Sequence, residues 1–329
     1  MSDKEKTKLE AFADGQTMRK RQSPKRKKSS AQDSVQKKSK NKKKAVAKPL
    51  ETPAIVVKDN LAQVEEQHNV IFKPNAGPQT DFLAAGEREV LYGGSAGGGK
   101  SYAMLADPLR FMGHPAFSGL LLRHTTEELR ELIFKSQEMY PKIWPGIKWS
   151  ERKMQWTAPS GARLWMSYLD REDDVLRYQG LAFSWIGFDE LTQWPTPFAW
   201  NYMRSRLRST AHDLPVYMRA TTNPGGRGHH WVKKMFIDPA PHNKSFDATD
   251  IETTEVLKYP AGHKKAGKAL FKRKFIPARL SDNPYLAEQG DYEAMLLSLP
   301  EQQRRQLLDG DWDIKEGAAF TEFDRNVHV

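Results

Sequence analysis

An eight-residue segment, GSAGGGKS at 94–101, constrains the fold of this chain more than any other feature. It fits the pattern G-x-x-x-x-G-K-[S/T], with a strand pattern at 89–92 before it and a helical pattern at 101–111 after it. Glycines let backbone N–H groups turn toward phosphate oxygens, and the following helix presents its positive N-terminal end. The predicted nucleotide-binding residues are Gly94, Gly97, Gly98, Gly99, Lys100 and Ser101.

Two side chains of this loop have separate roles in the prediction. Lys100 reaches the β and γ phosphates of ATP as a point charge, and Ser101 places its hydroxyl on Mg²⁺. The alternative is that the segment is a glycine-rich turn that binds no nucleotide. A match at every fixed position of the motif, between a strand and a helix, argues against this alternative. ATP and Mg²⁺ are therefore the predicted ligands.

A second element supplies two adjacent carboxylates. Asp189 and Glu190 follow the apolar segment 184–188, which is typical of a buried strand. A phosphate-loop enzyme needs a carboxylate near Mg²⁺ and a group that polarises the attacking water. We predict that Asp189 faces the metal and that Glu190 is the general base. Two surface acids are the weaker interpretation, because ending a buried strand in two acids is costly without a compensating cation.

The rest of the ordered sequence alternates between strand and helix patterns, which favours an α/β domain with a mainly parallel sheet. A helical region at 285–308 follows and is expected to pack as a cap or lid. Further strands are predicted at 119–123, 184–188 and 216–221, a hairpin at 153–158 and 162–168, and helices at 126–140 and 197–207.

The predicted strand at 216–221 ends in small polar residues followed by the turn sequence NPGG. Thr222 or Asn223 at this tip could hydrogen-bond the γ-phosphate or the attacking water and so report hydrolysis. Ordinary turn chemistry explains the same residues equally well. The local sequence leaves both interpretations open.

The positive charge of the chain is concentrated in its first 48 residues. The whole chain has 52 Lys and Arg against 41 Asp and Glu, whereas 1–48 alone has 17 basic and five acidic residues. Almost no large apolar residue occurs from 19 to 48, so we expect 1–50 to be a disordered basic tail. It could bind nucleic acid or act as an import signal, or be a solvated tail with loose affinity for phosphates.

The sequence lacks cysteine and lacks long apolar segments, and both absences exclude classes of protein. The chain has no cysteine, which excludes disulfides, thiolate metal sites and a thiol nucleophile. It also has no apolar run as long as a membrane span and no apolar signal-peptide segment at its beginning. We therefore expect a soluble protein that is not exported and has no membrane partner.

Taken in order, these motifs resemble the ATPase half of a tailed-bacteriophage terminase large subunit, from about Pro78 to Val329. The segment 78–83 resembles the adenine-reading segment of that family, with Gln79 as the amide that contacts the base. The loop at 93–101 matches its Walker A motif, 186–193 its Walker B motif, and 220–226 the coupling motif that contains Thr222 and Asn223.

The resemblance implies a P-loop NTPase of the ASCE type, with a central mainly parallel sheet flanked by helices and a small helical lid. It implies an ATP-hydrolysing motor that moves double-stranded DNA into a viral procapsid from the host cytoplasm. The implied partners are the portal protein, the small terminase subunit and further copies of the chain in a ring. Two alternatives are a helicase-like or remodelling ATPase and a nucleotide-sensing nucleic-acid adaptor without turnover.

The resemblance also points to an arginine that acts across the ring interface. Arg177 is the first candidate, with Arg204 and Arg206 as alternatives, and a surface or salt-bridged arginine is the bland interpretation. The expected organisation is a motor domain at 51–315, with lid elements near 51–85 and 280–312. A linker at 316–329 would lead toward a nuclease domain that this sequence does not contain, so no nuclease activity is expected.

Overall fold

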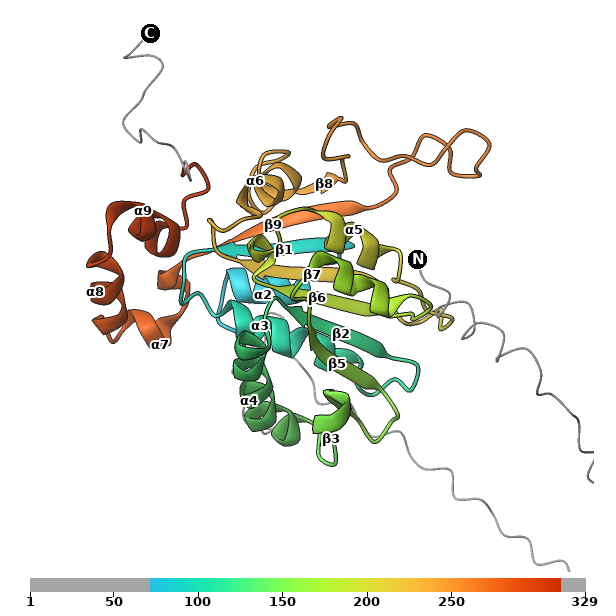
Figure 1. The fold of residues 1–329 in the computed structure, drawn as a ribbon, viewed down its shortest axis with the longest axis horizontal. Coiled ribbons are helices and arrows are strands. Elements are labelled where there is room, and N and C mark those ends of the chain that lie inside the picture. The colour runs from blue at the N-terminus through green and yellow to red at the C-terminus, as the bar shows by residue number, and fades with distance from the viewer. Residues whose placement is uncertain (1–71, 315–329) are drawn as a thin grey trace, which may run out of the picture. The chain divides into compact units, whose positions relative to one another are not determined.

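The computed structural model describes residues 72–314, and its centre is a nine-stranded sheet with the order β3-β4-β5-β2-β6-β7-β1-β9-β8 (Figure 1). The six strands from β5 to β9 in this order are parallel, and the pairs at the two edges are antiparallel. The strands are β1 (Glu89–Gly94), β2 (Ser118–Arg123), β3 (Lys148–Ser150), β4 (Gln155–Thr157), β5 (Arg163–Tyr168), β6 (Trp185–Asp189), β7 (Tyr217–Thr222), β8 (Ser245–Asp247) and β9 (Lys272–Ala278). The predicted α/β class with a mainly parallel sheet is confirmed.

The central strands are apolar because both faces of the sheet are covered. On β1, Val90 and Tyr92 belong to one buried cluster and Leu91 to the other, as expected when successive side chains alternate between faces. On β2, Leu121 lies in the first cluster, while Leu120 lies in the second. All six residues of β1 are buried, which places the loop that follows it at the end of a rigid strand.

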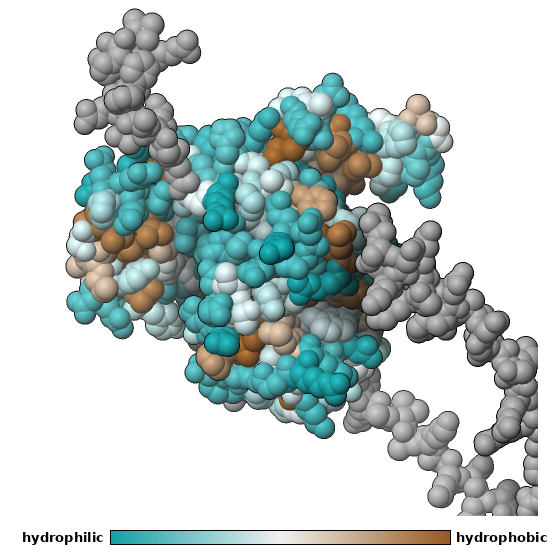
Figure 2. Space-filling view, in the orientation of Figure 1, coloured by the Kyte–Doolittle hydropathy of each residue, from teal (hydrophilic) through white to brown (hydrophobic). Residues whose placement is uncertain are grey.

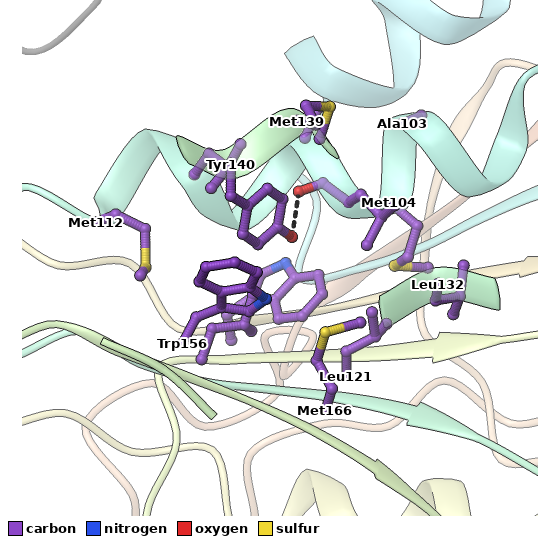
Figure 3. Packing of buried hydrophobic residues seen from close by; sticks show 14 of the residues in the cluster. Ala103, Met104, Met112, Leu121, Leu132, Met139, Tyr140, Trp156 and Met166 are labelled. Carbon is purple, nitrogen blue, oxygen red and sulfur yellow. Dashed lines mark hydrogen bonds between the residues drawn. The ribbon is translucent and has the colours of Figure 1, made fainter. Parts of the chain in front are cut away.

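Two groups of helices cover the two faces. The first cluster contains residues of α2 (Pro78–Ala84), α3 (Lys100–Ala106) and α4 (Thr126–Ile143), and the second contains residues of α5 (Phe198–Arg204) and α6 (His229–Val232). Figure 3 shows the first cluster from close by, where the Tyr140 hydroxyl donates to the Leu105 carbonyl at 2.9 Å. This bond joins α4 to α3, the helix that begins in the phosphate loop.

The long helix α4 begins at a capping box. The Thr125 hydroxyl accepts from the Glu128 N–H at 3.3 Å, and the Glu128 carboxylate accepts from the Thr125 N–H. This arrangement satisfies two backbone donors that the first turn leaves unpaired. The helix expected at 126–140 is therefore confirmed, and its start follows from local chemistry.

Three short helices follow β9: α7 (Pro284–Ala287), α8 (Asp291–Leu297) and α9 (Glu301–Arg304), and a π-helical turn at Arg305–Asp309 ends the series. They lie together at one side of the sheet (Figure 1). Large side chains are exposed on α7 and α8: Tyr285, Met295 and Leu297. Figure 2 shows brown, hydrophobic surface on this side of the molecule. The helical region expected at 285–308 is thus present, broken into short helices at Gly290 and Pro300, and its role as a lid stays a prediction.

Two differences between the predicted and the observed elements lie next to the phosphate loop. The helix expected at 101–111 is α-helical only as far as Ala106 and continues as a 3-10 helix over Asp107–Phe111, because Pro108 has no N–H to donate. The strand β9 was not predicted, although it pairs with β1 along six residues. Its sequence, KRKFIPA, carries three basic residues and a proline, which hide the apolar pattern.

Several expectations concern residues outside the described range. The basic tail at 1–50, the first part of the lid segment near 51–85 and the linker at 316–329 all lie there. Within 72–314, no helix is both long enough and apolar enough to cross a membrane.

Candidate nucleotide-binding and catalytic site

The phosphate loop connects β1 to α3 and begins at a glycine that no other residue could replace. Gly94 has a φ of 143°, and a Cβ atom built there would lie 2.2 Å from the Ala278 carbonyl oxygen. The Ser95 N–H donates to the same oxygen at 2.8 Å. The first fixed glycine of the motif therefore serves the close approach of the loop to β9.

Two side chains from the same part of the chain bind carbonyl oxygens of the loop. The Lys100 ammonium donates to the Ser95 carbonyl at 2.6 Å, and the Tyr92 hydroxyl donates to the Gly98 carbonyl at 2.7 Å. Both side chains are buried. The loop is therefore held in a defined conformation by protein contacts alone.

Gln79, on α2, is buried and contacts the loop directly. Its amide nitrogen donates to the Gly99 carbonyl at 2.8 Å, and its amide oxygen accepts from the Asn75 N–H at 2.6 Å. The amide expected at the nucleotide base is thus located beside the loop. In this structure both of its polar atoms are bonded to the chain itself.

The helical segment at the C-terminal side also contacts the loop, at two points. Asn283 donates from its side-chain nitrogen to the Gly97 carbonyl at 2.7 Å, and the Ala96 N–H donates to the Leu307 carbonyl at 2.7 Å. Asn283 directly precedes α7, and Leu307 follows α9. The lid and the phosphate loop are therefore joined by hydrogen bonds at both ends of the three helices.

Lys100 is buried within a group of charges at the carboxyl end of the sheet. Burial lowers the pKa of its ammonium group, and the negative charges of Glu190 and Asp189 partly oppose this effect. The side chain is 7% exposed. A buried cation beside this loop suits an anionic ligand.

Asp189 ends β6 and is fully buried. One carboxylate oxygen accepts from the Thr221 hydroxyl of β7, and the other forms an ion pair with the Arg123 guanidinium at the end of β2. The three strands are neighbours in the sheet, in the order β2, β6, β7. Asp189 therefore has a counterion within the chain, at the position where a metal ligand was predicted.

Glu190 has an unusual backbone conformation, with a φ of 61°. This left-handed conformation is costly for a residue with a side chain and is often found at functional sites. A carboxylate oxygen of Glu190 accepts from the Asn223 N–H at 3.3 Å and lies 3.5 Å from the Thr222 hydroxyl. Burial raises the pKa of the Glu190 carboxyl, and the charge of Asp189 adds to this effect.

The tip of β7 is bonded to the segment after Glu190. The Thr222 and Thr192 hydroxyls are 2.7 Å apart, and the Thr192 N–H donates to the Thr222 hydroxyl at 3.2 Å. The side-chain oxygen of Asn223 is buried and has no hydrogen-bond partner among residues 72–314. Thr222 and Asn223 are thus located next to Glu190, as the coupling hypothesis requires.

The donor set fits a Mg²⁺ ion that shares its ligands with nucleotide phosphates. Ser101 has a hydroxyl with no hydrogen bond to the described residues, and each Asp189 oxygen is engaged by a single residue. In the described part of the chain, no cluster of three or more His, Asp or Glu side chains could hold a metal by itself. Mg²⁺ commonly binds through one or two protein oxygens together with phosphates and waters.

The three candidate arginines have different surroundings. Arg177 lies on the 3-10 helix Glu172–Tyr178, is 42% exposed and pairs with Asp174 at 2.7 Å. Arg204 forms an ion pair with the buried Glu89. Arg206 donates to the Ser205 hydroxyl at 2.9 Å. None of the three contacts Lys100, Asp189 or Glu190 within the described chain.

Sequence reasoning missed two residues of the site, Arg123 and Asn283. Arg123 follows the apolar segment 119–122, just as Asp189 follows 184–188, and the carboxyl ends of parallel strands meet at one edge of a sheet. The position of Arg123 at the end of an apolar strand could therefore have indicated that it lies beside Asp189. Asn283 had no comparable signal, because its contact with Gly97 depends on how the lid packs.

The fold and the site together define a P-loop NTPase fold. Among solved structures, the chain is similar to the large terminase from a thermophilic bacteriophage, with 17% identity and a TM-score of 0.53 over 77% of this chain and 57% of that chain. The same large terminase in complex with ATP-gamma-S gives 16% identity and a TM-score of 0.50 over 73% of this chain and 53% of that chain. At this identity the likeness concerns the fold alone.

The sequence itself matches the family described as terminase large subunit, T4likevirus-type, N-terminal, over residues 91–327. This chain belongs to that family, so the family predicted from its motifs is confirmed. Its match spans a little over half the length of the thermophilic phage chains. No curated protein matches the sequence of this chain.

Proposed function

We propose that this chain is the ATP-hydrolysing motor part of a DNA-packaging machine, which moves double-stranded DNA into a viral procapsid. One observation carries the proposal: a complete phosphate loop lies beside Asp189 and Glu190 in a chain of the terminase large subunit family. Lys100, Asp189 and Glu190 meet at one edge of the sheet through β1, β6 and their neighbours. This combination suits hydrolysis of a nucleoside triphosphate.

In the proposed mechanism, Lys100 binds the β and γ phosphates, and its buried charge is already in place before the reaction. Glu190 accepts the proton of the attacking water, and the Asn223 N–H orients its carboxylate. Ser101 and Asp189 would hold Mg²⁺, which neutralises charge on the phosphates. Because Arg123 already pairs with Asp189, the carboxylate would be kept oriented when the metal is absent.

Gln79 is proposed to contact the adenine base. Its location against Gly99 supports this role, since the side chain lies within a hydrogen bond of the loop that would bind the phosphates. Thr222 and Asn223 are proposed as the coupling residues. Their contacts with Glu190 and with Thr192 support this role, because a change at Glu190 would reach the segment after β6 through them.

Arg177 is proposed to stabilise the transition state in a neighbouring copy of the chain. Its 42% exposure supports the role, because an arginine that acts across an interface must reach outward. Its ion pair with Asp174 would have to open in the assembly. Arg204 is the weaker candidate, since Glu89 and the Phe271 ring already hold it.

The remaining partners follow from the proposed role. A packaging motor would act in the host cytoplasm as a ring of copies, would contact the portal protein of the procapsid and would receive DNA with the help of a small terminase subunit. Of these partners, only a neighbouring copy of the chain would contribute to the nucleotide chemistry, through its Arg177.

ATP turnover, measured with and without duplex DNA and with purified procapsids, tests this function. We expect basal turnover, an increase with duplex DNA or procapsids, and DNA movement without strand separation. Strand separation would instead identify a helicase-like enzyme. A complete lack of turnover in the presence of ATP, Mg²⁺ and DNA would identify a nucleotide-sensing adaptor and refute the motor.

A further inference from the structure

A hairpin-like arm at 256–270 projects from the sheet between β8 and β9, and it is the orange loop at the upper right of Figure 1. The arm has a defined backbone. The Tyr259 N–H donates to the Lys268 carbonyl at 3.0 Å, and the Gly267 N–H returns a bond to the Tyr259 carbonyl at 3.1 Å. The Leu270 N–H also donates to the Leu257 carbonyl at 2.8 Å. These hydrogen bonds between the two halves of the arm restrict where its side chains can lie.

The arm carries a concentrated positive charge. No acidic residue occurs between positions 256 and 281. The charged side chains of the arm are Lys258, Lys264, Lys265 and Lys268, all exposed, and an exposed His263 lies among them. No ion pair joins any of the four lysines to another residue of the described chain. Their charges are therefore available to bind another molecule. By contrast, the ammonium group of nearby Lys272 lies 3.5 Å from the carboxylate of Asp247.

An aromatic stack orders the tip of the arm. The rings of Tyr259 and His263 are 4.5 Å apart and almost parallel, at 8°. The Lys265 ammonium lies 5.7 Å from the centre of the Tyr259 ring, on which a cation is attracted by the ring electrons. The stack keeps Lys265 close to Lys264 and His263 in a fixed local arrangement.

The chemistry of the arm favours a polyanion over a protein partner. Protein interfaces depend on a buried core of large apolar or aromatic anchors, and positive charges are placed at the rim. Leu270, which is 38% exposed, is the only large apolar residue of this arm that is strongly exposed. Clustered lysines without apolar anchors are instead suited to phosphate groups, which they contact without reading sequence.

We propose that the arm at 256–270 contacts the phosphate backbone of double-stranded DNA. This inference rests on the proposed function for the identity of the polyanion, and it assigns the contact to a surface remote from the nucleotide. The arm precedes β9, whereas Ala278 at the end of β9 contacts the phosphate loop. DNA contact and ATP hydrolysis would thus occur at opposite ends of one strand that is hydrogen-bonded to β1.

The test uses the full chain, including its basic tail, and a quadruple variant, K258Q/K264Q/K265Q/K268Q. Affinity for a duplex of mixed sequence is measured by fluorescence anisotropy at several salt concentrations. Each lysine that contacts a phosphate contributes about 0.9 to the slope of log affinity against log salt. We expect the slope to become shallower by about 2 to 4 units, with basal ATP turnover unchanged.

A matched control removes four positive charges at the other edge of the sheet, next to β3: K142Q/K148Q/R152Q/K153Q. These side chains are also exposed. The inference is overturned if the arm variant keeps the wild-type slope, as an acidic protein partner would predict, or if the control loses as much slope as the arm variant. Failure of the wild-type chain to hydrolyse ATP or bind duplex DNA would refute the proposed function instead.

Discussion

Two clusters of charge in this molecule are organised in opposite ways. At the carboxyl end of the sheet, the negative charges of Asp189 and Glu190 act to raise the pKa values of Lys100 and Arg123, and the charge of Asp189 acts to raise the pKa of Glu190. On the arm at 256–270, four exposed lysines have no acidic partner in the described chain. The comparison shows that the opposite charges of the first cluster lie beside one another within one chain, whereas the charges of the second have no counterpart among the described residues.

The difference has an energetic cause. Buried charges must be compensated within the protein, because removing one partner of a buried pair leaves an unpaired charge and costs about 3 to 5 kcal/mol. An exposed charge is solvated and contributes about 0 to 1 kcal/mol through any single pair. Substitutions should therefore affect chemistry and stability in the first cluster, and binding alone in the second.

The largest effect is expected for Lys100→Ala. Loss of the buried charge at the phosphates should reduce ATP turnover below detection, because water cannot replace a pre-organised cation in a closed site. A coupled phosphate-release assay measures this, and Lys142→Ala, an exposed lysine, is the control. Near-normal turnover by Lys100→Ala would refute the assignment of the site.

Glu190→Gln should separate binding from chemistry. The amide is almost the same size as the carboxylate but cannot accept a proton, so hydrolysis should be lost while nucleotide binding persists. Equilibrium binding of a fluorescent ATP analogue and turnover are measured on the same preparation. Loss of binding together with turnover would make Glu190 a structural residue or a metal ligand.

Arg177→Ala tests whether the exposed Arg177 of one copy acts in the catalytic site of a neighbouring copy. If it acts in trans, the variant should bind ATP normally and hydrolyse it about 10³ to 10⁵ times more slowly. Mixing it with Glu190→Gln should restore part of the activity, because some interfaces then combine an intact Arg177 with an intact Glu190. No recovery in a mixture shown to co-assemble would contradict the trans role.

Arg123→Ala should reveal the stabilising role of the buried ion pair. The substitution leaves Asp189 buried and unpaired, so the free energy of unfolding should fall by about 3 to 5 kcal/mol. Urea denaturation without nucleotide measures the change. In the same assay, Arg177→Ala is the comparison, and its exposed pair with Asp174 should account for no more than about 1 kcal/mol. Equal losses would remove the energetic distinction between the two regions.

The smallest effect is expected for Asn283→Ala, at the contact between the lid and the phosphate loop. Loss of one hydrogen bond to the Gly97 carbonyl is worth about 1 kcal/mol, which corresponds to a roughly fivefold weaker binding of ADP. Asn201→Ala, on the exposed side of α5, is the control. An unchanged affinity would show that the lid contact does not support nucleotide binding.

Much of the fold was predictable because the chemistry is local. The strands around the phosphate loop and Asp189 are continuous apolar runs that end in the candidate site residues, and Thr125 with Glu128 marks the start of α4. By contrast, β9 was missed. The exposed Lys272 and the half-buried Lys274 and Pro277 are tolerated because the strand is paired with β1 on one side and only with the short β8 on the other.

The sequence by itself determined the nucleotide loop, the paired acids and the family, because each depends on residue types at a fixed spacing along the chain. Tertiary structure alone decided that Arg123 is the counterion of Asp189 and that Asn283 holds Gly97. It also decided that Arg204 is bound to Glu89 and that Arg177 is exposed. These contacts join residues distant in sequence, and their partners are set by how strands and helices pack rather than by any local pattern.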